Sequence, residues 1–255
     1  MGQIVHSFIK DLARNWTLWV YTLFLLATSL GIFYIDGHEE KTVLGLLSVT
    51  QLLIPSYVMI FSLVYYFNSL DFLTLLLAQP IKRTRIILGF SISLSVVFVV
   101  AALLGVGIPL VIVAPGTPAV LTVIIGIVLT LIFTVLAVLV GVVTKDKSQG
   151  LGITLAILVW FILLFDGVIL LIMYVFSDYP VEKIVLFLTC LNPIDLGRIT
   201  IIMHTDAAAL MGYTGAVFEK YLTTFTGSLA SLLTFVIWIA VPVLFLVRVF
   251  NKKDF

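Results

Sequence analysis

Six long apolar stretches account for most of this chain of 255 residues. A helix needs about 20 apolar residues to cross the ~30 Å hydrocarbon core of a bilayer, and helices of soluble domains rarely sustain such runs. We therefore predict an all-α integral membrane protein with six transmembrane helices, forming a single transmembrane domain over residues 1–255. The expected spans are about 16–34, 44–67, 86–114, 120–143, 150–176 and 229–249.

The composition leaves no room for a soluble enzyme domain. Charged residues make up 11% of the chain, against roughly 25% in soluble proteins. The longest segment between spans, residues 177–228, is too short and too irregular to fold as a separate domain. Basic residues are dispersed over short loops, which argues against nucleic-acid binding, and the lone Cys190 excludes an internal disulfide.

The distribution of positive charge predicts the orientation in the membrane. If the N-terminus lies inside, ten of the fourteen Lys and Arg residues flank the inner ends of the spans and four lie outside. Short loops rich in Lys and Arg remain in the cytoplasm, so we expect both termini to be cytoplasmic. The inner residues are Lys10, Arg14, Lys82, Arg83, Arg85, Lys145, Lys147, Arg248, Lys252 and Lys253.

A short amphipathic helix is predicted before the first span, over residues 3–15. Its apolar residues include Phe8 and Leu12, and Lys10 and Arg14 lie on the opposite face. Such a helix is expected to lie along the inner surface, with its basic face toward lipid head groups. Within the spans, Pro55, the segment 105–109 and Pro242 are possible kink points.

The second inner loop is predicted to contain another short helix. Asn68 is a candidate N-cap with Asp71 three positions on, and Pro80 stops the apolar run that follows. A surface helix that is apolar on much of its circumference needs a groove, supplied either by this chain or by a cytoplasmic partner. The residues expected to matter for this contact are Asn68, Asp71, Leu73, Leu75, Leu76, Gln79, Pro80, Lys82 and Arg83.

The outer segment holds two further features. Residues 206–225 have the pattern of a surface helix that would cover the outer mouth. Farther toward the N-terminus, Asn192-Pro193 restricts the preceding backbone to extended forms, which can stop a helix and present Asp195 and Arg198 as a local pair. This Asn192–Arg198 motif is either a loop staple or a docking site for an outer partner.

Asp166 is the only ionisable residue deep in a predicted span. Burying an isolated carboxylate there costs at least about 2.5 kcal/mol, so it should face protein or water, or be protonated. It is either a substrate or proton site, or the partner of an interhelical hydrogen bond to Gln51 or Ser48.

No residues are predicted to be catalytic. The chain lacks a phosphate-binding Gly-x-x-x-x-Gly-Lys-Ser/Thr loop and a His-Glu-x-x-His zinc motif, and one intramembrane Asp cannot form an aspartyl dyad. Met203, His204 and Met211 are weak candidates for a soft-metal site because thioether and imidazole both suit copper. We expect no resident metal.

Three segments resemble ABC-2-type permeases, the membrane subunits of ATP-driven exporters. Residues 73–89 are similar to the family's coupling helix and the start of its third span. Residues 159–166 resemble the fifth span, and residues 191–199 resemble an outer-side motif. The last two segments together resemble the NosY-like branch, whose transporter serves copper-site maturation of nitrous-oxide reductase. The lead into the coupling helix, residues 67–72, lacks the glycines and glutamate typical of the family.

The resemblance implies a homodimer of this chain in a bacterial inner membrane. Two cytoplasmic ATPase subunits would bind ATP and Mg and grip residues 68–79, and a periplasmic accessory protein would rest on the outer surface. The competing interpretations are a proton-coupled secondary carrier that uses Asp166, and a scaffold that relays an ATPase signal without transport.

Overall fold

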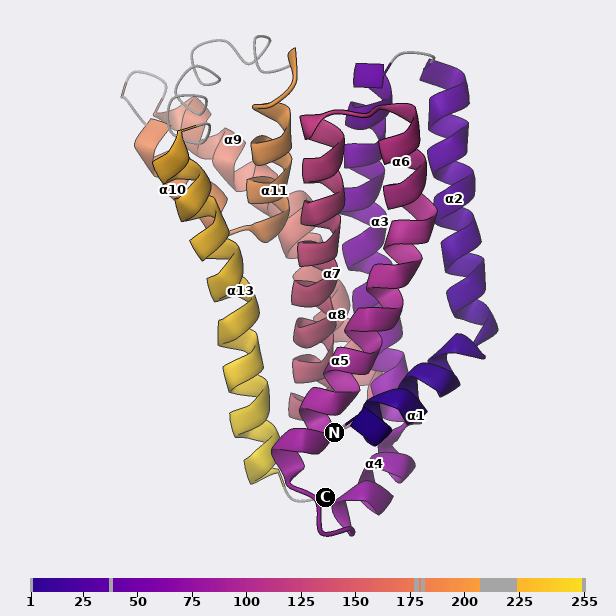
Figure 1. Ribbon diagram of the computed structural model, residues 1–255. Helices are drawn as coiled ribbons and strands as arrows, with labels where there is room; N and C mark the ends of the chain where they lie inside the picture. Colours follow the sequence, from indigo (N-terminus) through magenta and orange to yellow (C-terminus); the bar gives the residue numbers. More distant parts are fainter. Residues whose placement is uncertain (1, 37–38, 177–178, 180–181, 207–223, 254–255) are drawn as a thin grey trace.

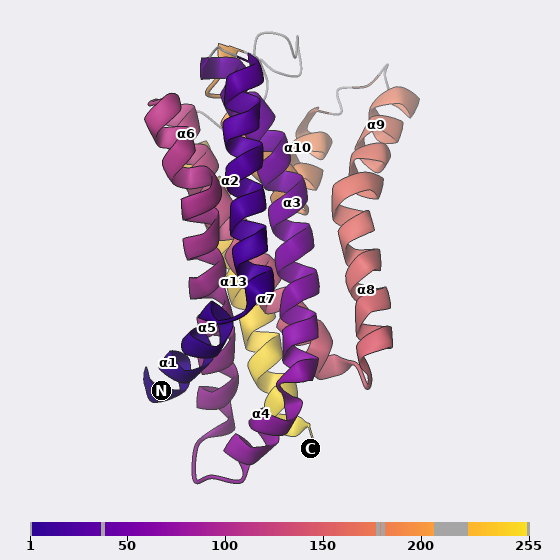
Figure 2. The ribbon, with the colours of Figure 1, turned by 90° about the vertical axis from the view of Figure 1, so that its right-hand side faces the viewer.

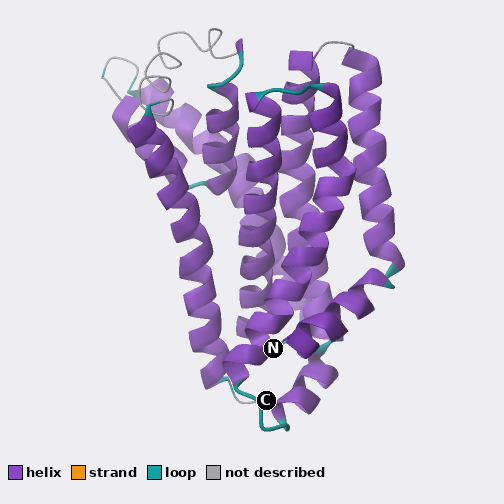
Figure 3. Ribbon diagram, viewed as in Figure 1, coloured by secondary structure: helices purple, strands orange, loops and turns teal. Residues whose placement is uncertain are grey.

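The computed structural model describes residues 2–36, 39–176, 179, 182–206 and 224–253. These residues form helices and connecting loops, with no strand among them (Figure 3). Six helical segments are long and apolar enough to cross a membrane, which confirms the predicted fold class: Trp16–Ile35, Lys41–Asn68, Arg83–Val113, Thr117–Val143, Lys147–Val175 and Gly227–Lys252. The predicted surface helix at 206–225 lies almost entirely outside the described residues.

The spans are continuous except for two interruptions by π-helix, η1 and η2. In chain order the elements are α1 (Gly2–Ala13), α2 (Trp16–Asp36), α3 (Glu39–Asn68), α4 (Leu70–Leu77), α5 (Arg83–Ala102), η1 (Leu103–Gly107), α6 (Ile108–Val113), α7 (Thr117–Val143), α8 (Lys147–Val159), η2 (Trp160–Leu164), α9 (Phe165–Val175), α10 (Glu182–Cys190), α11 (Pro193–Ile202) and α13 (Phe225–Lys252).

Helices α3 and α7 form the centre of the bundle. In the most apolar part of α7, 61% of residues are buried, whereas the corresponding share for the span from α8 to α9 is 11%. Figure 2 shows α8 and α9 at one side of the bundle, with α9 leaning away from it. The span α8–α9 therefore presents most of its surface to lipid or to another polypeptide.

A proline explains the π-helix in the third span. Pro109 has no N–H to donate to the carbonyl of Gly105, four residues earlier. The Ser29 hydroxyl from α2 donates to that carbonyl instead, at 2.8 Å. A Cβ on Gly105 would lie 2.5 Å from Cβ of Leu25, so only glycine permits this close approach of α2 to η1.

Helices α1 and α4 lie at the end of the bundle that holds both termini (Figure 1). In α1, Phe8 and Leu12 are buried. The Phe8 ring packs edge-on against Phe72 and Phe90, with centroids 5.3 and 5.1 Å away. The apolar face of α1 therefore packs on α4 and α5 of its own chain, whereas Lys10 in the helix and Arg14 just after it are exposed.

The predicted N-cap of α4 is wrong by one residue. Asn68 is the last residue of α3, and Ser69 occupies the N-cap position without a side-chain cap. The reason is that α3 extends one residue farther than the apolar pattern indicated: the Ser69 N–H still donates to the carbonyls of Tyr65 and Tyr66. The helix itself is shorter than the predicted 68–79.

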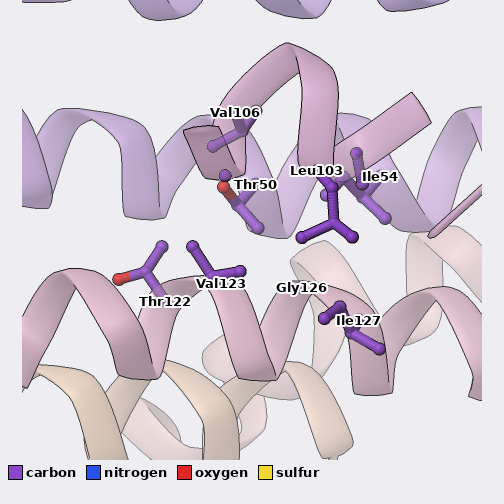
Figure 4. Close-up of a pocket in the computed structure, with 10 residues that line it drawn as sticks. Thr50, Ile54, Leu103, Val106, Thr122, Val123, Gly126 and Ile127 are labelled. Atoms are coloured by element: carbon purple, nitrogen blue, oxygen red, sulfur yellow. The ribbon is translucent and has the colours of Figure 1, made fainter. Parts of the chain in front are cut away.

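The bundle interior is tightly packed where α3, η1 and α7 meet. A cavity of only about 10 Å³ remains there, lined by Thr50, Ile54, Val106 and Gly126 among others (Figure 4). A cavity of that size is at the lower limit for one water molecule. In this conformation, the space between these three elements is too small for any cargo larger than water.

Candidate functional site

The segment between the last two spans contains a sharply bent helix pair that the sequence pattern did not indicate. The chain bends by 116° between α10 and α11, at residues 191–192. Together the two helices are apolar enough to count as a broken span or a re-entrant loop. Asn192 and Pro193 produce the bend: Asn192 is the N-cap of α11, accepting from the Ile194 N–H at 3.0 Å, and Pro193 occupies the first turn.

Asn192 also joins the bend to the fifth span. In η2 the Phe165 N–H donates to Trp160, five residues back, so Phe161 loses its usual helical donor. Nδ2 of Asn192 donates to that free Phe161 carbonyl at 2.8 Å and to Oδ2 of Asp195 at 2.7 Å. The fully buried Asn192 thus satisfies groups of two separate segments.

Arg198 lies between two carboxylates. Its Nη1 and Nη2 donate to the two oxygens of Asp166 at 2.8 and 2.9 Å, a bidentate pair between α11 and α9. Nη2 also lies 2.9 Å from Oδ1 of Asp195 in the same helix. The predicted local pair of Asp195 and Arg198 is present, and Asp166 completes an ion triad.

The predicted partners of Asp166 were wrong. Gln51 donates to the Ile194 carbonyl at 3.3 Å, and Ser48 bonds to Leu44 within its own helix. The reason is the bend: α11 turns back toward the bundle and brings Arg198 to the level of Asp166. Because a carboxylate deep in a span must find a partner, the cation supplied by α11 replaces the neutral groups on α3.

Further contacts fix α11 against the bundle. Trp238 of α13 donates its indole N–H to the Cys190 carbonyl at 3.1 Å, at the end of α10. A Cβ on Gly197 would lie 2.6 Å from Cγ2 of Ile125, so α11 approaches α7 as closely as glycine allows. The bent pair is thus held by α3, α7, η2 and α13.

The triad lines a cleft of about 470 Å³ between α9 and the bent pair. Asp195 is almost completely buried, with 3% of its side chain exposed, while about a third of each of Asp166 and Arg198 is exposed. The remaining walls are mostly apolar, from Ile169, Leu170, Met173, Val185, Ile199 and Ile202. The arrangement combines a polar cluster with an apolar cleft in the half of the molecule away from both termini (Figure 1).

The weak metal candidates do not converge among the described residues. Met203 is buried in an apolar cluster with Val185 and Ile199. His204 is exposed, and its Nδ1 contacts the Thr200 carbonyl at 2.8 Å. Met211 lies outside the described residues.

The residues predicted around α4 divide into two sets. Leu73 and Leu76 are buried against the chain itself, whereas Phe72 and Leu75 remain exposed, at 41% and 66%. The sequence predicted a groove for this short helix, supplied by the chain itself or by a partner. On the side of Leu73 and Leu76, the chain itself supplies it. Asp71, Gln79, Pro80, Lys82 and Arg83 are also exposed.

Arg83 ties the exit of this loop to the C-terminal end of α13. Its Nη1 donates to the Lys253 carbonyl at 2.8 Å, and Asn251 contacts Thr84. Lys253 in turn donates to the Val142 carbonyl at 2.7 Å, and burial lowers the pKa of its amine. This contact set, which the charge pattern did not indicate, links the ends of α5, α7 and α13.

A helical bundle with six candidate membrane spans, a bent helix pair and a partly buried ion triad defines a polytopic membrane protein. The chain belongs to the ABC-2 family of transporter proteins, whose family pattern it matches over residues 72–255. It is similar to a probable ABC transporter permease protein, NosY, of Pseudomonas aeruginosa, with 26% identity across 82% of this chain and 84% of that protein. It is therefore a membrane permease subunit, in a family whose ATPase activity resides on separate cytoplasmic subunits.

Proposed function

We propose that two copies of this chain and two cytoplasmic ATPase subunits form an ATP-driven transporter in a bacterial inner membrane, with both termini in the cytoplasm. ATP and Mg would bind to the ATPase subunits. The observation that carries this proposal is the exposed apolar face of α4, next to a fully packed opposite face. Exposure of apolar side chains to water is unfavourable, and a bound partner would cover them.

The packing of α4 suggests how motion would pass into the membrane. Phe72 of α4 contacts Phe8 of α1, which in turn contacts Phe90 of α5, so a push on α4 would reach the third span through α1. The Arg83 contacts extend that connection to α13. Because the bundle interior is closed at α3, η1 and α7, the cargo path or the mechanical output would run at the surface between the two copies.

The structure sharpens the test of this ATPase contact. Leu75→Glu adds a charge to the exposed face, whereas a charge at the buried Leu76 would also disturb folding. We expect Leu75→Glu to abolish co-purification of the ATPase subunit, or its coupling to transport, while insertion of the chain is unchanged. The measurements are the amount of ATPase retained on the tagged chain and its hydrolysis rate in the assembled complex.

Ser148→Glu is the matched control for this experiment. Ser148 is exposed in the first turn of α8, in the neighbouring loop at the same end, where an acidic residue favours the helix dipole. It should leave ATPase binding intact. If Leu75→Glu behaves like Ser148→Glu, the assignment of α4 as the coupling helix is wrong.

We further propose that the transporter is NosDFY-like and supports copper-centre assembly of nitrous-oxide reductase. The support is the similarity to the NosY permease; the Asn192–Arg198 motif adds none, because Asn192 and Asp195 are buried and bonded within the chain. Deleting this chain from its host should leave the reductase without its full copper content, measured on the purified enzyme. A normal copper content would remove this assignment while leaving the permease assignment in place.

A proton-coupled carrier that uses Asp166 is the second candidate, because this carboxylate lines the outer cleft. Against it, both Asp166 oxygens already accept from Arg198. The carrier hypothesis requires that the purified chain alone moves cargo down a pH gradient in liposomes, and that Asp166→Asn stops it. Transport only with ATPase and ATP would favour the first proposal.

A further inference from the structure

A second cleft lies on the lipid-facing side of the bundle, where α1 meets α2 and both pass α5. Its volume is about 220 Å³. One wall is a stripe of α5 with a four-residue spacing, Val96, Val100 and Leu104. At 1.5 Å per residue, this stripe runs about 12 Å along the helix axis. The groove is therefore elongated in the direction that acyl chains take in a bilayer.

The groove is apolar along its length and is bounded by α1 at one end. Leu18, Trp19 and Thr22 of α2 form the opposite wall, and Ile9 and Ala13 of α1 lie at its end. The one polar side chain among these is already satisfied, since the Thr22 hydroxyl donates to the Leu18 carbonyl at 2.9 Å. The cavity offers contacts for a hydrocarbon chain and no free hydrogen-bonding group for a polar solute.

The elbow between α1 and α2 is held in place by Trp19. Its indole N–H donates to the carbonyl of Ala13, the last residue of α1, at 2.9 Å. A carbonyl at the C-terminal end of a helix otherwise has no backbone partner. This bond keeps the Trp19 ring beside the groove, with half of its surface exposed.

Two cations lie beside the closed end of the groove. At 100° per residue, Lys10 follows the groove-lining Ile9 around α1, on the side away from buried Phe8. Arg14 follows Ala13, the last residue of α1, in the turn that leads into α2. Both side chains are exposed, and neither forms an ion pair within the part of the chain that the structure describes. Asp11 points elsewhere, accepting from the Tyr65 hydroxyl at 2.7 Å.

We propose that this groove binds one anionic phospholipid. An acyl chain lies between α2 and α5, and the phosphate head group contacts Lys10 and Arg14. The occupant follows from charge complementarity, because an apolar groove closed by two unpaired cations matches a hydrocarbon chain that ends in a negative group. The lipid would bridge α1 to the third span, which is the helix that α4 contacts.

The test uses dibrominated lipids, which quench nearby tryptophan fluorescence. The full-length chain is reconstituted in vesicles after Trp16, Trp160 and Trp238 are changed to Phe, so that Trp19 is its only tryptophan and reports on the groove. Dibrominated phosphatidylglycerol should quench Trp19 at a lower mole fraction than dibrominated phosphatidylcholine. Lys10→Gln and Arg14→Gln should each reduce this preference about fivefold, as expected for ~1 kcal/mol per basic residue at an anionic surface.

Controls separate a specific site from general attraction. Arg248→Gln and Lys252→Gln remove two exposed cations at the same end of the bundle but on α13, and should leave the preference unchanged. Ala13→Phe fills the groove and should reduce quenching by both lipids. If the two lipids quench Trp19 equally in the protein that retains Lys10 and Arg14, the proposal is wrong.

A second measurement does not depend on the tryptophan substitutions. Mass spectrometry of lipid retained by the otherwise unmodified chain, purified from vesicles with equal amounts of both lipids, should show enrichment of phosphatidylglycerol. The Lys10→Gln/Arg14→Gln double variant should lose that enrichment. If both proteins retain the same lipid composition, the site does not exist as proposed.

Discussion

At the scale of single residues, the Asn192 side chain makes three hydrogen bonds at the bend between α10 and α11. Asn192→Ala removes the cap of α11, worth about 1 kcal/mol, and the interhelical bond to the Phe161 carbonyl, worth about 0.6 kcal/mol in a membrane. It also removes the bond to Asp195 of the same helix. We expect a loss of about 2 kcal/mol, measured as a lower thermal unfolding midpoint in detergent. Asn68→Ala, at an exposed position, serves as the control. An equal effect of both changes would mean that the Asn192 contacts contribute little.

Gly197 provides a test of the close approach between α11 and α7. Gly197→Ala places a methyl group 2.6 Å from Cγ2 of Ile125 and should destabilise the protein by about 1–3 kcal/mol. Gly167→Ala is the matched change, because nothing lies within 4 Å of its Cβ position and alanine favours a helix by up to about 1 kcal/mol. Thermal unfolding should therefore shift in opposite directions. Adding Ile125→Ala should remove part of the clash in the Gly197→Ala protein.

At the scale of the elements, the π-helix η1 depends on a group outside its own helix. Ser29→Ala leaves the Gly105 carbonyl without its donor, and an unsatisfied buried carbonyl costs about 1–3 kcal/mol. Thr28→Ala is the control, since the Thr28 hydroxyl bonds only to carbonyls of α2. We expect faster amide hydrogen exchange in residues 105–113 of the Ser29→Ala protein alone. Unchanged exchange would show that η1 is held by packing rather than by this bond.

The sequence was a good guide to the spans and a poor one to their contacts. Apolar length placed the six long helices to within a few residues, because lipid requires each backbone bond to be made inside the helix. The bent pair was missed because α10 and α11 are nine and ten residues long, each too short for a span. The available signal was the apolar run on both sides of Asn192-Pro193.

At the scale of the whole molecule, both termini and α4 lie at one end of the bundle, and the loop between α6 and α7 lies at the other (Figure 1). In a Cys190→Ser background, we expect Tyr34→Cys and Thr117→Cys to react with a membrane-impermeant maleimide on intact spheroplasts. His6→Cys and Asn68→Cys should react only after lysis. The measurement is a mass shift on a gel, and labelling of His6→Cys in intact spheroplasts would invert the proposed orientation.

The weakly packed span α8–α9 is also a property of the whole molecule. Its neighbours inside the chain cover little of it, so its exposed residues suit either lipid or a second copy. Sequence hydropathy alone could not distinguish this span from α7, since both are strongly apolar. The difference appears only when the helices are assembled and one of them lies at the edge.

Helix number and length could be read from the amino acids, because the cost of an unpaired peptide group in hydrocarbon acts on each segment separately. The family resemblance also came from local motifs. Partner choice required the assembled bundle: Arg198 rather than Gln51 pairs with Asp166, and α4 buries Leu73 and Leu76 but not Leu75. Such choices depend on where a bend or an elbow places a side chain in space, and the sum of many weak contacts sets that position.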